Sequence, residues 1–165
     1  METSALLLRP ARLEDAPLLQ YLVQAAFTEY EGKLDPPSGA HQETVETVRE
    51  LLQKGGAILA LVENEPAGCV FFQNEGSYLW LERLSVLPKY RRRGVARALI
   101  EAVEQEAALQ KIPAVQLGTR LALTHLKDYY TRLGYRPIRF EAHEGYTKPT
   151  YVLMEKEIRS KGSNP

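Results

Sequence analysis

The run of residues 81–98, L-E-R-L-S-V-L-P-K-Y-R-R-R-G-V-A-R-A, leads from a predicted strand through a basic turn into a predicted helix. Four arginines gather where that helix begins, at positions 91, 92, 93 and 97. A helix N-terminus behaves as a partial positive charge, so each cation there costs up to about 1 kcal/mol. The unpaired N–H groups at the same end can bind an anion. The pattern therefore predicts an anion, such as a phosphate group, at the beginning of the helix.

Small residues in the same turn favour this interpretation. Gly94 and Ala96 leave the backbone uncovered, so phosphate oxygens could approach the amides closely. The alternative is a solvated basic turn on the surface. A P-loop is excluded because the sequence has no Gly-x-x-x-x-Gly-Lys-Ser/Thr stretch. The dinucleotide fingerprint is excluded because it needs three glycines to open the helix, and only Gly94 is present.

Periodicity and turn signals predict one mixed α/β layer structure. Short turns between the three strands of residues 57–87 imply an antiparallel meander. Gly134 stands where a left-handed cap would end the last helix, and the polar tail 160–165 is predicted to fray. The predicted order is strand, two helices, three strands, helix, strand, helix and two strands, over residues 5–8, 14–30, 41–54, 57–62, 68–73, 78–87, 94–109, 114–117, 123–133, 135–140 and 150–155.

Composition limits the classes of function. A chain of 165 residues predicts a single domain over residues 1–165. Because 21 basic residues balance 21 acidic ones, neither nucleic acid nor an anionic membrane is expected as a partner. One cysteine, Cys69, allows no intramolecular disulfide and favours a reducing, cytoplasmic location. The apolar run Ala5–Leu8 is too short for a signal peptide, and no run approaches the roughly 20 apolar residues of a membrane span.

The hexapeptide R-R-R-G-V-A at 91–96 resembles the signature of the GNAT superfamily of N-acetyltransferases: Gln or Arg, two residues, Gly, one residue, then Gly or Ala. The preceding L-S-V-L-P-K-Y at 84–90 matches as well, and the order of elements agrees along nearly the whole chain. The resemblance implies a GNAT-like α/β fold, with a central, mostly antiparallel sheet of six to seven strands flanked by about four helices. It also implies acetyl-CoA as co-substrate.

The resemblance assigns donor-binding residues too. The segment Leu84–Val86 would be the bulged end of the fourth strand, whose backbone pairs with the pantetheine arm. The amides of Arg92–Ala96 would hold the pyrophosphate of CoA. The predicted donor-binding set is Leu84, Ser85, Val86, Arg91, Arg92, Arg93, Gly94, Val95, Ala96 and Arg97.

A second block, D-Y-Y-T-R-L-G-Y at 128–135, resembles the family's aromatic-Tyr-x-x-Leu-Gly-aromatic motif. In many members the tyrosine in the place of Tyr130 protonates the departing CoA thiolate, a role that a phenol can fill. The alternative is that Tyr129 and Tyr130 are both core aromatics. The sequence departs from the family at Leu123, where an asparagine commonly helps to position the cofactor.

Glu82 is the preferred base on the amine side. An amine that attacks a thioester must first lose its proton, to a base or through a water chain. Regular alternation would put Glu82 and Leu84 on one face of the strand and Arg83 on the other, if the bulge comes later. Burial would raise the pKa of the Glu82 carboxyl toward a base's working range. The alternative is a structural ion pair with an arginine.

The acceptor side is expected in the loop 27–39 and the segment 143–151. The candidates there are Glu29, Tyr30, His143, Tyr146 and Tyr151. Cys69 is expected to be a buried small hydrophobe. The three histidines lack ligand spacing, so no metal site is predicted.

Two further functions remain open at this stage: a non-catalytic acyl-CoA-binding regulatory module, and an acyltransferase that uses a different acyl-CoA. The predicted acceptor is a small-molecule or peptide amine. Late strands often pair between subunits in the superfamily, so the resemblance also makes a homodimer plausible.

Overall fold

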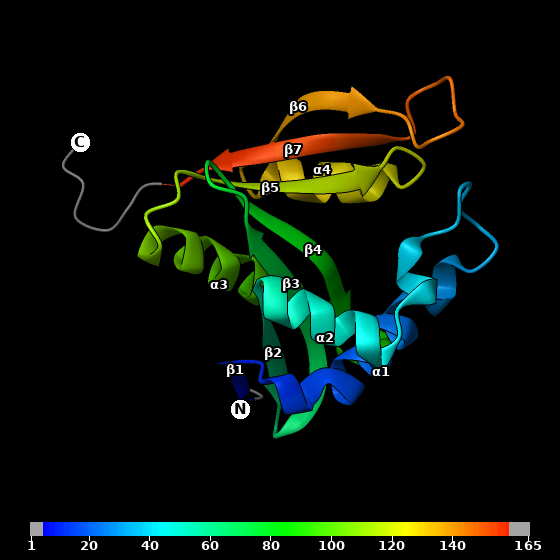
Figure 1. Ribbon diagram of the computed structural model, residues 1–165. Helices are drawn as coiled ribbons and strands as arrows, with labels where there is room; N and C mark the ends of the chain where they lie inside the picture. Colours follow the sequence, from blue (N-terminus) through cyan, green and yellow to red (C-terminus); the bar gives the residue numbers. More distant parts are fainter. Residues whose placement is uncertain (1–4, 159–165) are drawn as a thin grey trace. The chain divides into compact units, whose positions relative to one another are not determined.

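The computed structural model describes residues 5–158, and the chain divides into two compact units. The first unit holds the described residues up to Gln73 together with Leu81–Val103, and the second holds Asn74–Trp80 together with the described residues from Glu104 onward. The elements, shown in Figure 1, are β1 (Leu6–Pro10), α1 (Ala16–Phe27), α2 (Val45–Lys54), β2 (Gly56–Val62), β3 (Glu65–Asn74), β4 (Leu79–Val86), α3 (Val95–Leu109), β5 (Ala114–Arg120), α4 (Thr124–Arg132), β6 (Arg136–Glu141) and β7 (Tyr151–Glu157).

The strands form one seven-stranded sheet in the order β1-β2-β3-β4-β5-β7-β6. In the first unit, β1 pairs antiparallel with β2, and β2 pairs antiparallel with β3. In the second unit, β7 runs antiparallel to both β5 and β6, and β5 runs parallel to the first residues of β4. The prediction of a mostly antiparallel sheet of six to seven strands with about four helices is confirmed.

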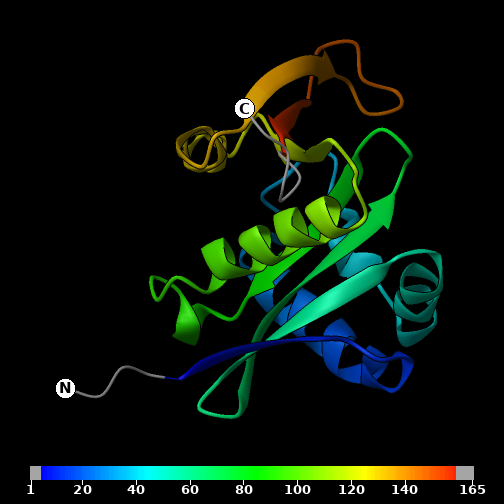
Figure 2. The same cartoon turned by 90° about the vertical axis from the view of Figure 1, so that its left-hand side faces the viewer.

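In the first unit, α1 and α2 lie on one face of the sheet and the beginning of α3 lies on the other (Figures 1 and 2). Within α1, Leu19, Leu22 and Val23 are fully buried. Cys69 of β3 belongs to the same core at 0% exposure, which confirms that it is a buried small hydrophobe. The core cluster comprises Ala16, Leu19, Leu22, Val23, Ala40, Val48, Ala57, Leu59, Cys69 and Phe71.

Two predicted helices are shorter than expected. The segment 14–30 forms α1, flanked by the 3₁₀ turns Leu13–Asp15 and Thr28–Tyr30. The helix predicted over 41–54 begins only at Val45. Thr44 takes the N-cap position there, where its side chain accepts from the Thr47 amide at 3.1 Å. Extended backbone at Thr44 separates α2 from the 3₁₀ turn Gly39–Gln42.

The tail 160–165, predicted to fray, lies outside the described residues. Within residues 5–158, every helix is too short or too polar to cross a bilayer. The single-domain boundary 1–165 stays a prediction.

Candidate functional site

The end of β4 departs from regular strand geometry at Arg83. Its φ is +53°, in the left-handed region that costs a non-glycine residue about 1–2 kcal/mol. The buried Ser85 hydroxyl donates to the Arg83 carbonyl at 3.0 Å and so stabilises the distortion. On the neighbouring β3, a Cβ at Gly68 would lie 2.4 Å from the Ser85 carbonyl oxygen. The two backbones therefore approach closely where the strand is distorted.

This distortion falls one residue before the predicted segment Leu84–Val86. The expectation that Glu82 and Leu84 share a face required the irregularity to come later. Instead, the left-handed residue Arg83 lies between them and breaks the alternation. All three side chains are half-buried, while Leu81 and Ser85 are buried.

A loop with two left-handed residues joins β4 to α3. After the 3₁₀ turn Pro88–Tyr90, Arg92 has a φ of +64° and Gly94 a φ of +77°. A Cβ at Gly94 would meet no atom within 4 Å, so the loop is open on that side. Where residues with left-handed backbone alternate with right-handed ones, successive N–H groups form a concave array that can bind an anion.

The helix that follows adds donors to this loop. The first bond that it returns to the loop runs from the Ala98 amide to the Gly94 carbonyl, at 3.0 Å. Helical geometry therefore gives the amides of Val95, Ala96 and Arg97 no acceptor inside α3. These amides and the adjoining loop are the groups on which the predicted anion site depends, and anion binding by them stays a prediction.

The arginine side chains of the loop have different environments. Arg91 donates from Nε to the Val86 carbonyl at 3.2 Å and from Nη2 to the Ala26 carbonyl at 3.1 Å. Its Nη1 pairs with the Glu29 carboxylate. By contrast, Arg93 lies over the Tyr90 ring, with its guanidinium carbon 5.7 Å from the ring centroid. The side chain of Arg91 thus fixes the loop to α1.

Further along α3, Arg97 is exposed and donates to the Glu101 carboxylate at 3.0 Å. Such a surface pair between successive helical turns contributes only about 0.3–0.5 kcal/mol. An incoming anion could therefore compete for Arg97 at little cost.

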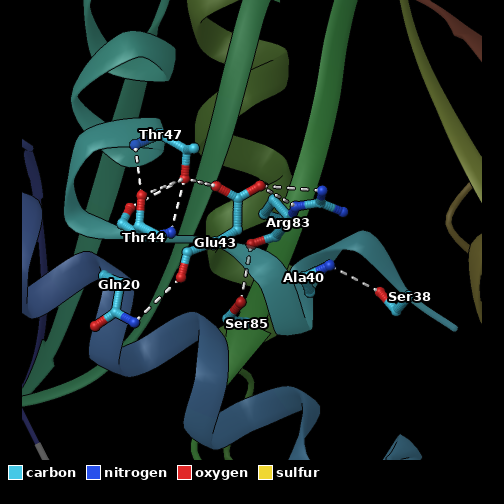
Figure 3. Close-up of polar contacts among 8 residues, drawn as sticks. All are labelled: Gln20, Ser38, Ala40, Glu43, Thr44, Thr47, Arg83 and Ser85. Carbon is cyan, nitrogen blue, oxygen red and sulfur yellow. Dashed lines mark hydrogen bonds and ion pairs between the residues drawn. The ribbon is translucent and has the colours of Figure 1, made fainter.

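Figure 3 shows a polar cluster beside the distorted end of β4. Arg83 donates to one oxygen of the Glu43 carboxylate from Nε at 3.3 Å and from Nη2 at 3.1 Å. The Thr47 hydroxyl donates to the other oxygen of Glu43 at 2.6 Å, and the Gln20 amide donates to the Glu43 carbonyl at 3.2 Å. The pairing of Arg83 with Glu43 was not predicted from the sequence. The one local signal is an arginine inside an apolar strand.

The predicted acceptor residues fall into two groups. In the first unit, Glu29 pairs with Arg91, and the Tyr30 ring meets the Phe27 ring edge-on at 6.0 Å. Burial, followed by the nearby Glu29 carboxylate, raises the pKa of the Tyr30 phenol. The acceptor role of both residues stays a prediction.

In the second unit, His143 brings the other candidates together. Its ring lies 4.8 Å from the Tyr151 ring and 6.4 Å from the Tyr146 ring, both edge-on. The His143 amide donates to the Thr150 hydroxyl at 2.9 Å. Burial and the Arg120 charge lower the pKa of the His143 imidazole.

Tyr130 lies in α4 of the second unit and is 7% exposed. Its ring meets those of Tyr129 and Tyr135 edge-on, at 5.7 and 6.1 Å. Its carbonyl accepts from the Tyr135 amide across Gly134, whose φ of +100° confirms the predicted left-handed cap. At the other end of α4, the N-cap residue Leu123 makes no side-chain cap bond.

A profile described as the acetyltransferase (GNAT) family matches residues 18–135. A Bacillus subtilis (strain 168) protein, named as a candidate acetyltransferase, is 33% identical over 79 residues, which are 48% of this chain and 52% of the relative. The match thus spans about half the length of that relative.

Solved structures share the fold at low sequence identity. The ribosomal-protein-S18-alanine N-acetyltransferase of Escherichia coli has a TM-score of 0.76 at 18% identity, with 98% of this chain and 99% of that chain covered. A GNAT family acetyltransferase of Elizabethkingia anophelis, solved with acetyl-CoA bound, has a TM-score of 0.71 at 19% identity, covering 93% and 98%. The fold is the mixed α/β fold of these acetyltransferases.

Proposed function

Since the chain belongs to the acetyltransferase (GNAT) family, we propose that it is an N-acetyltransferase that takes its acetyl group from acetyl-CoA. The observation that carries the proposal is the loop before α3, in which Arg92 and Gly94 have left-handed backbone and from which the helix begins at Val95. The first N–H groups of a helix have no acceptor within it. A diphosphate fits such a helix N-terminus because it accepts several N–H bonds and complements the dipole. The acetyl-CoA bound to the Elizabethkingia anophelis relative supports this choice of donor.

The proposed reaction is a direct transfer in a ternary complex. The amine nitrogen bonds to the thioester carbonyl carbon, and the carbon–sulfur bond then breaks. Glu82 takes the proton that the amine loses, directly or through water, and Tyr130 gives a proton to the thiolate that leaves. The half-buried position of Glu82 in β4 and the motif around Tyr130 support these two roles.

The proposed acceptor is a primary amine on a small molecule or peptide, in a cytoplasmic setting. The S18-alanine specificity named for the Escherichia coli relative supports an amine acceptor. Glu29 and Tyr30, with Tyr146 and Tyr151, are the proposed acceptor contacts. The paired aromatic rings around His143 support the second pair, because aromatic faces attract cationic amines.

The test of donor binding is thermal unfolding with acetyl-CoA, and with ATP and dephospho-CoA as controls. At about 100 times the dissociation constant, acetyl-CoA should add roughly 2.7 kcal/mol. For a domain of this size, that raises Tm by about 5 to 10 °C. ATP at the same concentration should give no comparable shift.

A matched pair of variants locates the site. Gly94 and Gly76 both have positive φ, +77° and +92°, and open space around a new Cβ. Gly94→Ala and Gly76→Ala should therefore cost similar stability, yet only Gly94→Ala should reduce the acetyl-CoA shift. Absence of a shift in the unmodified protein, or equal shifts in both variants, contradicts the proposed donor site.

The proposed role of Glu82 as the base for the acceptor amine predicts a loss of turnover when its carboxylate is removed. Glu82→Gln keeps the size of the side chain but removes the base. Turnover, measured as release of CoA thiol with a panel of amines, should fall by about 100-fold or more. The acetyl-CoA thermal shift should stay within error of the unmodified value. Unchanged turnover would remove Glu82 from the mechanism.

A further inference from the structure

The segment 142–150 joins β6 to β7 in the second unit and is drawn in orange in Figure 1. Thr150 closes this connection through its backbone. Its amide donates to the Glu141 carbonyl at 2.8 Å, and its carbonyl accepts from the Leu121 amide at 3.0 Å. Since Glu141 ends β6 and Leu121 directly follows β5, the sheet itself fixes the backbone of Thr150.

The Thr150 hydroxyl holds His143 at two points. Its oxygen accepts from the His143 amide at 2.9 Å, and the hydroxyl also bonds to Nδ1 of the His143 ring. Within the described part of the chain, Nδ1 is the acceptor that remains for the hydroxyl proton. A neutral imidazole has one donor and one acceptor nitrogen. With Nδ1 as the acceptor, the ring proton lies on Nε2.

The Nε2 atom of His143 is left as an accessible donor. It makes no hydrogen bond within residues 5–158, and it is not among the enclosed side-chain nitrogens there. The Tyr151 and Tyr146 rings flank the imidazole edge-on, at 4.8 and 6.4 Å. Burial, and then the Arg120 charge, lower the pKa of the imidazole, so the ring is uncharged at neutral pH. An uncharged N–H within range of an arginine charge suits an electronegative oxygen and disfavours a second cation.

We propose that His143 is a specificity-determining residue whose Nε2–H donates to a carbonyl oxygen next to the acceptor amine, and that Thr150 is the positioning residue that orients it. The acceptor class is then an α-amino amide or a peptide N-terminus. A polyamine has no such oxygen and would bring a second positive charge toward Arg120. This inference rests on the proposed function, in which Tyr146 and Tyr151 contact the acceptor.

Initial rates of CoA release with alaninamide, 2-aminobutane and spermidine test the selection. Each rate is divided by the fraction of amine that is uncharged, because only that form attacks the thioester. The unmodified protein should favour alaninamide over the other two amines by about fivefold or more in kcat/KM, since they lack the oxygen. His143→Phe keeps the ring and removes the donor. It should raise KM for alaninamide by about fivefold, leave kcat nearly unchanged and abolish the preference.

Replacements of Thr150 test the positioning role. Thr150→Val removes the hydroxyl at nearly constant volume and should reduce the preference for alaninamide, whereas Thr150→Ser should keep it. Thr131→Val is the matched control, because the exposed Thr131 hydroxyl bonds to the Lys127 carbonyl within α4. Nitrogen NMR of the His143 ring at pH 7 reads the tautomer without any acceptor. The proton should lie on Nε2 in the unmodified protein and in Thr150→Ser, and on both nitrogens in turn in Thr150→Val.

The outcomes separate this inference from the proposed function. A His143 proton on Nδ1, a preference for spermidine, or an unchanged preference in His143→Phe overturns the inference and leaves the donor site intact. An acetyl-CoA thermal shift without turnover of any of the three amines overturns the assignment of the acceptor class. Absence of both the shift and turnover refutes the proposed function, and the inference with it.

Discussion

Replacement of Tyr135 by Phe tests the polar cluster that Tyr135 forms with Glu104 and Lys156. Tyr135 is 2% exposed, and its hydroxyl donates to Glu104 Oε2 at 2.9 Å. Lys156 donates to the other oxygen of the same carboxylate at 3.0 Å. The Tyr135 amide also donates to the Tyr130 carbonyl, so this cluster is linked to the end of α4 that carries the proposed acid. All of these residues lie in the second unit.

The expected loss of stability follows from the contacts that Phe keeps and those that it removes. Phe keeps the buried ring and its edge-on contact with Tyr130, 6.1 Å between centroids. It removes one hydrogen bond to a charged group, which contributes about 1.5–3 kcal/mol. Lys156 still donates to one oxygen of Glu104, so the carboxylate keeps a charged hydrogen-bond partner. For a domain of this size, the loss lowers Tm by roughly 3 to 12 °C.

The pH dependence gives a sharper test than the size of the loss. Burial, and then the Glu104 charge, raise the pKa of the Tyr135 phenol above its ordinary value. In the unfolded chain the phenol ionises at about pH 10. The stability that Tyr135 contributes is therefore fully present below that pH and is lost as the pH rises. The advantage over Tyr135→Phe should shrink by about 1.4 kcal/mol per pH unit above this point.

The assay is thermal unfolding of both proteins from pH 7 to pH 11. Tyr21→Phe is the control, because Tyr21 is 56% exposed and should shift Tm by less than about 1 °C. A Tyr135→Phe protein that melts within 1 °C of the parent would mean that the bond to Glu104 adds nothing beyond ring burial. A constant difference up to pH 11 would refute the assignment of the raised pKa to the buried phenol.

Two further predictions concern the first unit. Gly68→Ala should cost at least about 2 kcal/mol, because its Cβ would lie 2.4 Å from the Ser85 carbonyl oxygen; Gly32→Ala, with φ +71° and open space, should cost only the backbone strain of about 1 kcal/mol, and denaturant unfolding measures both. The bidentate bond from Arg9 lowers the pKa of the Asp15 carboxyl, so its stabilisation is present above the unfolded pKa near 4 and is lost as the pH falls; the difference in Tm between the parent and Asp15→Asn should therefore shrink between about pH 5 and pH 2.

Much of the fold follows from local patterns in the sequence. Apolar residues at helical spacing and alternation between turn signals predict the type and order of the α-helices and strands within residues 5–158. The errors lie at the ends of elements, where side-chain bonds decide. The hydroxyl of Thr44, bonded to the Thr47 amide, moves the beginning of α2 to Val45. Seven residues of β5 pair with β7, a contact that extends the strand beyond the predicted Leu117 to Arg120.

The position of the loop before α3 was predictable from the sequence, but its side-chain contacts were not. A cluster of arginines at a helix N-terminus conflicts with the helix dipole, and that conflict marks the loop from the sequence alone. Which arginine turns inward depends on residues far away in the chain. Arg91 reaches the Ala26 carbonyl, 65 positions earlier, and no local pattern records that distance.

Arg83 shows most clearly why the pattern of an isolated strand cannot identify every residue that shapes the candidate site. Two adjacent charged residues, Glu82 and Arg83, interrupt an apolar strand. Alternation places them on opposite faces of the strand and gives no reason to distinguish one from the other. The left-handed backbone of Arg83 removes that symmetry, and Glu43, 40 positions earlier, supplies its partner. A non-glycine residue keeps a strained conformation only where its surroundings over-determine it, and such strain gathers at binding and catalytic sites. The strain at Arg83 therefore supports the end of β4 as part of the site, independently of any sequence motif.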